Sequence, residues 1–175
     1  MRVFPFASLL TPRSEVPRTG THADPAVQRA LNLIDDPLNP VQLLTAEELR
    51  EVYRRHGYDL GQRGGDIIAF RAPNASGVYD PHIYLNADAE RIRNARTDPS
   101  PLNDLLLAGT LVHEQTHNTE SGPQGELAAM QLEMDYLASQ VPTLKGWDRR
   151  QAEARVKQIR DVLAAQRGAL ARSLR

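Results

Sequence analysis

Residues 101–117 read Pro-Leu-Asn-Asp-Leu-Leu-Leu-Ala-Gly-Thr-Leu-Val-His-Glu-Gln-Thr-His, a mostly apolar stretch that ends in two histidines four residues apart. Ser100 precedes it as a candidate N-cap, and Pro101 has the fixed φ that suits a first helical position. Apolar side chains then fall on nearly all sides of a helix running from Leu102 to about Asn118, which is typical of a buried helix. We therefore expect a core helix that carries the HEQTH sequence, residues 113–117, in its middle.

The HEQTH sequence has the spacing of a metal site. His113 and His117 lie on one helical face, about 6 Å apart along the axis, so both imidazoles can reach one ion at about 2.0–2.1 Å. Glu114 points about 100° away around the helix, so it misses the ion and reaches a water beside it. Zinc lowers the pKa of such a water to about 7, and a carboxylate can take its proton. The alternative is a pair of structural histidines, but two His and a Glu in an apolar helix are costly to bury without partners.

A catalytic zinc ion needs a third protein ligand. No histidine follows His117, so the ligand should be a carboxylate or come from upstream. Glu126 is favoured because it lies in the first turn of the next helix, expected over residues 124–140, and short loops place successive helices side by side. Glu133, two turns further along the same face, is the second candidate, and Glu120 is closer in sequence. Glu126 can also be read simply as an acid favoured by the helix dipole.

The rest of the chain supplies the other elements of one domain. Asp24 and Pro25 open a short helix to Asp35, and a capping box at residues 45–48 opens another to about His56. Asp66–Phe70 and His82–Asn86 are expected as strands of a hairpin, and a last helix as running from about Asp148. The predicted fold is α+β, mostly helical, with a small antiparallel sheet beside the HEQTH helix. Residues 1–25 are expected to form an N-terminal arm and residues 26–175 the domain.

Composition excludes several partners. The chain has 175 residues and a net charge of -1, which gives no argument for a nucleic-acid partner. It has no cysteine, so a metal must use His, Asp, Glu or water. The apolar stretch Val3–Leu10 is broken by Pro5 and is too short to span a membrane. We expect a cytoplasmic protein without a membrane partner.

The HEQTH helix, a turn, and a second helix opening with Glu126-Leu127-Ala128-Ala129 resemble the zincin metallopeptidases, specifically the gluzincin branch. The resemblance covers residues 79–140. It implies a Zn²⁺ ion held by His113, His117 and Glu126, with Glu114 as general base and a peptide or protein as substrate.

Two departures from that family pattern concern the surroundings of the metal. Met130 stands where thermolysin-like enzymes have an Asp that orients a histidine, so this support must come from elsewhere. No later histidine is present to stabilise the oxyanion. Tyr136, Tyr84 or an arginine are the candidates to replace it.

Zincins also place an edge strand before the active helix, antiparallel to the bound peptide. Residues 83–87 occupy that place in the sequence, so the resemblance assigns substrate contacts to Tyr84, Asn86 and Ala87. Asn86-Ala87 is similar to a pair on the substrate strand of thermolysin. Ile83 and Leu85 can equally be core residues of an ordinary strand.

The expected function is zinc-dependent hydrolysis of peptide bonds. One alternative is a non-catalytic zincin-like domain that binds a metal or a partner. Another is a metallohydrolase for a different amide or ester, which the sequence does not separate from a peptidase.

Overall fold

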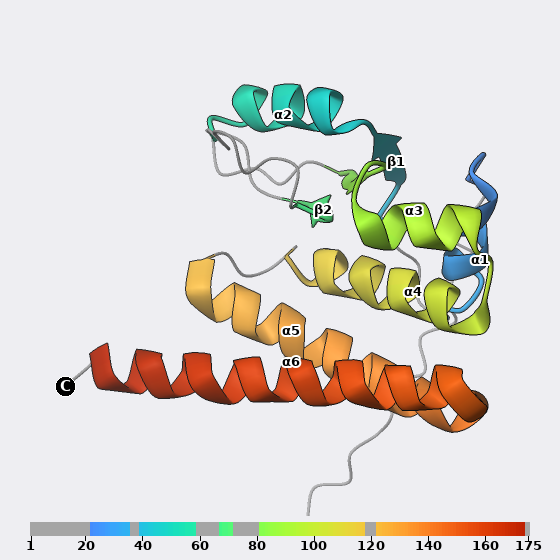
Figure 1. Ribbon diagram of the computed structural model, residues 1–175. Helices are drawn as coiled ribbons and strands as arrows, with labels where there is room; N and C mark the ends of the chain where they lie inside the picture. Colours follow the sequence, from blue (N-terminus) through green and yellow to red (C-terminus); the bar gives the residue numbers. More distant parts are fainter. Residues whose placement is uncertain (1–21, 36–38, 59–66, 72–80, 118–121, 174–175) are drawn as a thin grey trace, which may run out of the picture.

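The computed structural model describes residues 22–35, 39–58, 67–71, 81–117 and 122–173, drawn in colour in Figure 1. The elements are, in chain order, α1 (Pro25–Leu31), β1 (Val41–Leu44), α2 (Ala46–Arg55), β2 (Ala69–Phe70), β3 (Ile83–Asn86), α3 (Glu90–Thr97), α4 (Pro101–Thr116), α5 (Gly122–Gln140), the 3₁₀ turn η2 (Val141–Thr143) and α6 (Gly146–Ser173). The described part is therefore mostly helical with one small sheet, and the α+β class is confirmed. Most of the expected arm, residues 1–21, lies outside the described residues, and Pro25 already belongs to α1. No described helix has both the length and the apolar character needed to cross a membrane.

The sheet is mixed, which corrects the expectation of an antiparallel one. Its strand order is β1-β3-β2; β1 runs parallel to β3, and β2 runs antiparallel to it. The antiparallel pairing of β2 with β3 agrees with the expected hairpin, although β2 is shorter than residues 66–70. The parallel strand β1 was not predicted, and the chain reaches β3 from it after passing through α2.

Strand β3 lies in the centre of the sheet, so the prediction that residues 83–87 form a free edge for peptide is wrong. On one side Ile83 N donates to Pro40 O at 2.8 Å, and on the other Asn86 N donates to Ile68 O at 2.9 Å. All four residues of β3 are buried. The strand that lies over the C-terminal part of α4 in Figure 1 is β2, at an edge of the described sheet.

Helix α4 begins as expected but ends early. The Ser100 hydroxyl accepts a hydrogen bond from Asn103 N at 3.1 Å, and Pro101 takes the first helical position. The helix ends at Thr116, and His117 N bonds to Glu114 O at 3.3 Å, the closure of a tightened last turn. The HEQTH sequence therefore occupies the end of the helix and not its middle, so His117 stands at the helix terminus.

Close packing of α5 against α4 brings Glu126 near that terminus. A Cβ built on Gly109 would come within 3.0 Å of Leu137 Cδ2, so the glycine makes room for a fully buried leucine of α5. The space beside Gly109 is thus filled by Leu137. Helix α5 starts at Gly122, slightly before the expected position, and continues to Gln140.

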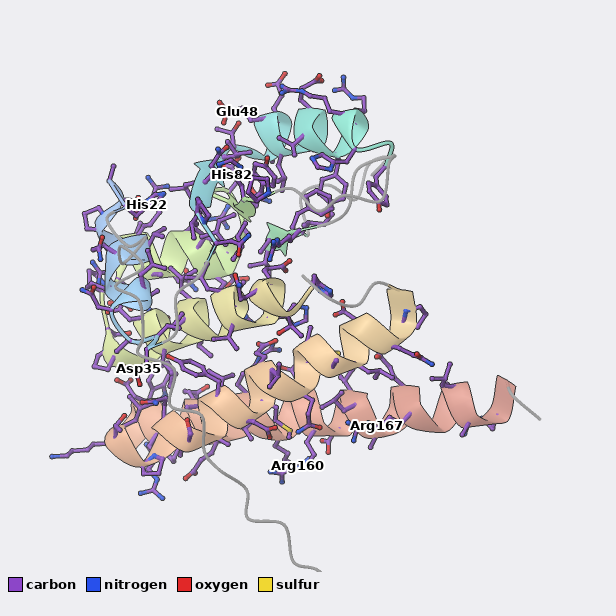
Figure 2. All side chains as sticks on the ribbon, turned by 180° about the vertical axis from the view of Figure 1, so that it is seen from behind. His22, Asp35, Glu48, His82, Arg160 and Arg167 are labelled. Atoms are coloured by element: carbon purple, nitrogen blue, oxygen red, sulfur yellow. The ribbon has the colours of Figure 1, made fainter. Side chains whose placement is uncertain are left out.

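Helix α6 packs on α5 through a buried stripe that consists of Ala152, Val156, Ile159 and Leu163. Arg160 is exposed and points from α6 away from the other elements (Figure 2).

Candidate metal centre

Three side chains from two helices converge at the end of α4. His113 Nε2 lies 3.4 Å from Glu126 Oε1, and His117 Nε2 lies 3.5 Å from Glu126 Oε2. The two imidazole rings are 5.2 Å apart between centroids. One ligand atom from each of the three residues lies within 4.8 Å of the others. Glu126 is therefore the carboxylate that the structure brings to the two histidines.

These donors fit a zinc ion in type and spacing. Ligands at about 2.0–2.2 Å in tetrahedral directions hold neighbouring donor atoms about 3.4 Å apart. The nitrogen–oxygen separations of 3.4 and 3.5 Å are close to this value, with His113 facing Oε1 of Glu126 and His117 facing Oε2. Two imidazoles and one carboxylate also leave the fourth position open, as in catalytic zinc sites. Glu120 lies outside the described residues.

Glu114 lies in the same cavity, whose volume is about 640 Å³. Its side chain is buried, and burial raises the pKa of this carboxyl to about 7, with the charge on His113 opposing the rise. Arg71 opposes it further, whereas the carboxylates of Glu126 and Glu133 reinforce it. A carboxyl that titrates near neutral pH is suited to general base catalysis.

Glu133 was the second candidate for the third ligand, but it lies on the other side of the His113 ring from Glu126, facing Nδ1 and not Nε2. Glu133 Oε2 lies 3.3 Å from His113 Nδ1, at ion-pair distance but not aligned for a hydrogen bond. Burial alone would lower the pKa of His113, but the carboxylates of Glu126 and Glu133 raise it to about 10. Glu133 thus contacts the ring nitrogen opposite the metal-facing one, the usual place of a carboxylate that orients a metal-binding histidine.

Two arginines hold Glu133 in place. Arg155 Nη2 donates to Glu133 Oε1 at 2.8 Å, and Arg91 Nη1 lies 3.5 Å from the same oxygen. Burial would raise the pKa of Glu133, but His113 and Arg155, helped by Arg91, lower it to about 2. Sequence reasoning named Glu133 from its helical spacing to Glu126 but missed both arginines, because they come from α3 and α6.

The tyrosines expected to stabilise an oxyanion lie elsewhere. Tyr136 donates its hydroxyl to Leu33 O at 3.0 Å, and Tyr84 lines a separate cavity beside α2. The buried Arg71, directly after β2, lines the site cavity instead. Tyr53 also lines it and lies near enough to Glu114 that the carboxylate, after burial, raises the pKa of its hydroxyl.

The residues expected to bind substrate are not brought to this cavity. Asn86 Nδ2 donates to Ile67 O at 2.8 Å and Asn86 Oδ1 accepts from Asp88 N at 3.0 Å, so this side chain holds the strand end. Ala87 N bonds to Leu44 O at 2.7 Å. The cavity wall consists instead of residues 67–71 with Tyr53 and Tyr58.

The other described histidines lie apart from the centre. Figure 2 shows His22 beside α1 and His82 beside the sheet, and neither lines the site cavity. The candidate metal ligands therefore come from the end of α4 and the start of α5.

Comparisons with protein-family models, with curated proteins and with solved structures found no match. The function is therefore inferred from the site itself.

Proposed function

We propose that this chain is a zinc-dependent hydrolase that cleaves peptide bonds or closely related amides. The observation that carries the proposal is the convergence of His113, His117 and Glu126 beside the buried Glu114, within one open cavity. The donor set suits zinc, and the adjacent carboxyl has a pKa suited to proton transfer at neutral pH.

Zinc, when bound, supplies Lewis acidity that polarises a carbonyl and acidifies a water. His113, His117 and Glu126 are the residues that would hold it. Glu114 accepts the proton of the attacking water and passes it to the leaving amine, so one carboxyl serves as base and then as acid. Arg71 places a positive charge at the same cavity, where negative charge develops on the carbonyl oxygen.

Peptide substrate is expected along β2 and not along β3. Residues 67–71 line the cavity, and β2 lies at an edge of the described sheet, so its main chain can pair with an extended peptide. Phe70 is stacked on Tyr53, with ring centroids 3.8 Å apart, and gives this wall an apolar surface for a substrate side chain.

The proposal is tested with a pair of variants and a peptide library. Glu114→Gln should retain one zinc ion and lose about 10²–10⁴-fold in hydrolysis, because it removes the base and leaves the ligands. His113→Ala should lose both zinc and hydrolysis. Cleavage that survives in Glu114→Gln would contradict the role of the base. Zinc binding without cleavage of any peptide, amide or ester would favour the non-catalytic metal- or partner-binding domain.

A further inference from the structure

A partly buried charge network joins four helices behind the candidate metal centre. Glu133 of α5 is the one acid of this network among the residues that the structure describes, and its side chain is 6% exposed. Arg155 reaches it from α6 and Arg91 from α3. Arg91 Nη1 also donates to the Thr110 hydroxyl on α4 at 2.7 Å, one turn before His113. The network therefore connects the last helix of the domain to the helix that carries both histidines.

The two arginines contact the same oxygen of Glu133. Both distances, 2.8 Å from Arg155 and 3.5 Å from Arg91, are to Oε1. Oε2 is left facing His113 Nδ1 at 3.3 Å. The guanidinium pair thus fixes the rotation of the carboxylate and directs its second oxygen at the imidazole.

This arrangement determines which nitrogen of His113 can bind a metal. A carboxylate between two guanidinium groups is ionised and can only accept hydrogen bonds. Nδ1 is then the nitrogen that can donate to Oε2, so in the neutral ring that binds a metal the lone pair lies on Nε2. Nε2 is the atom that faces Glu126 at 3.4 Å. The Nδ1 contact is not aligned for a hydrogen bond here, and such contacts are commonly long or poorly aligned before a site is filled.

We propose that Arg91 and Arg155 are positioning residues: they orient Glu133 so that it holds His113 with Nε2 directed at the metal. This inference rests on the proposed function, because it concerns the same zinc site. It also makes α6, which supplies none of the ligands, a determinant of metal affinity. Buried ion pairs are often replaceable by apolar residues without loss of stability. An effect on the metal beyond an effect on stability is therefore the distinguishing result.

The test compares Arg155→Met with a matched control, Arg29→Met. Arg29 forms an ion pair of similar kind with Asp104 at 3.0 Å, at the other end of α4 from the histidines. Zinc affinity of the full chain is measured by competition with a chromophoric chelator, and stability by denaturant unfolding of the metal-free protein. Visible absorption of the cobalt-substituted protein reports the geometry of the ligands.

Arg155→Met should bind zinc about 10–100-fold more weakly than the wild type, the usual cost of losing such support, and should change the cobalt spectrum. Arg29→Met should leave the zinc affinity and the cobalt spectrum unchanged. Arg155→Lys should recover part of the zinc affinity, because a cation again faces Glu133. Unchanged affinity and spectrum in Arg155→Met, or equal losses of affinity in Arg155→Met and Arg29→Met, would overturn the positioning role alone. A wild-type chain that takes up no zinc would overturn the proposed function and this inference together.

Discussion

Glu114 and Glu133 are both buried carboxyls that influence His113, yet their surroundings move their pKa values in opposite directions. Burial dominates at Glu114 and raises its pKa to about 7, whereas at Glu133 His113 and the two guanidinium groups outweigh burial and lower the pKa to about 2. Two carboxyls separated in this way take different roles. Glu114 can exchange a proton near neutral pH, and Glu133 remains an anion that orients the imidazole.

The raised pKa of His113 predicts that zinc uptake depends on pH. Only a neutral imidazole binds a metal. The carboxylates of Glu126 and Glu133 raise the pKa of His113 to about 10, so in the metal-free protein the ring carries an extra proton at neutral pH. Zinc must displace that proton, so affinity should tighten with rising pH by up to about tenfold per unit between pH 6 and 8. Calorimetry in buffers of different ionisation enthalpy would detect the released proton. An affinity that is the same at pH 6 and pH 8 would contradict this account of His113.

The lowered pKa of Glu133 predicts a loss of stability in acid. A carboxyl whose pKa falls from 4.5 to about 2 on folding stabilises the protein above pH 4.5, and this contribution disappears as the pH falls toward 2. The shift corresponds to a contribution on the order of 3 kcal/mol. The free energy of unfolding of the metal-free wild type should therefore exceed that of Glu133→Gln near pH 6, and the difference should narrow toward pH 3. If the difference in the free energy of unfolding between the wild type and Glu133→Gln widened in acid, the pKa of Glu133 could not be lowered by folding.

At the scale of elements, the contact between α4 and α5 sets the distance from Glu126 to the histidines. Gly109→Ala adds a methyl group 3.0 Å from Leu137 Cδ2, and such overpacking costs about 1–3 kcal/mol, partly offset by the better helix propensity of alanine. We expect a net loss of about 0–2 kcal/mol and weaker zinc binding, because the helices must separate.

Gly168→Ala in α6 is the control for this substitution. The added methyl group would meet only the flexible end of Arg172, at 3.5 Å, so alanine should stabilise the helix by up to about 1 kcal/mol without affecting zinc. Denaturant unfolding and zinc titration of both variants test the contact. Equal effects of the two substitutions on zinc affinity would remove the special role of Gly109.

Local signals in the sequence predicted the elements that begin with a cap. Asp24, Thr45 and Ser100 accept hydrogen bonds from the first turns of their helices, as their positions indicated. Helix α3 was missed because Ala89 makes no capping bond and the helix has only two buried residues, Ile92 and Ala95. Strand β1 was missed because its residues are mostly half-buried and show no clear alternation.

The part of the site carried by one helix could be predicted, and the part assembled by the whole fold could not. Helical spacing alone relates His113, Glu114 and His117, and a short connection brings Glu126 beside them. The site cavity is also lined by three arginines from different parts of the chain, Arg71, Arg91 and Arg155. Their side chains meet there only after these parts have packed together. The central position of β3 could not be predicted either, because it depends on pairing with β1, a strand from a distant part of the sequence.

Because its ligands come from α4 and α5, zinc should stabilise the whole molecule. A ligand at a hundredfold excess over its Kd adds about 2.7 kcal/mol to the folded state. Thermal unfolding should occur at a higher temperature with zinc than with a chelator, and His117→Ala should abolish the difference. An unfolding temperature that zinc does not change in the wild type would be the contrary result.

Crystals of the zinc-loaded protein, measured above and below the zinc absorption edge, would show whether one ion binds between the three candidate ligands. We expect one anomalous peak, at about 2.0–2.2 Å from His113 Nε2, His117 Nε2 and a carboxylate oxygen of Glu126. A peak at other residues, or none between these three side chains, would contradict the proposed zinc site.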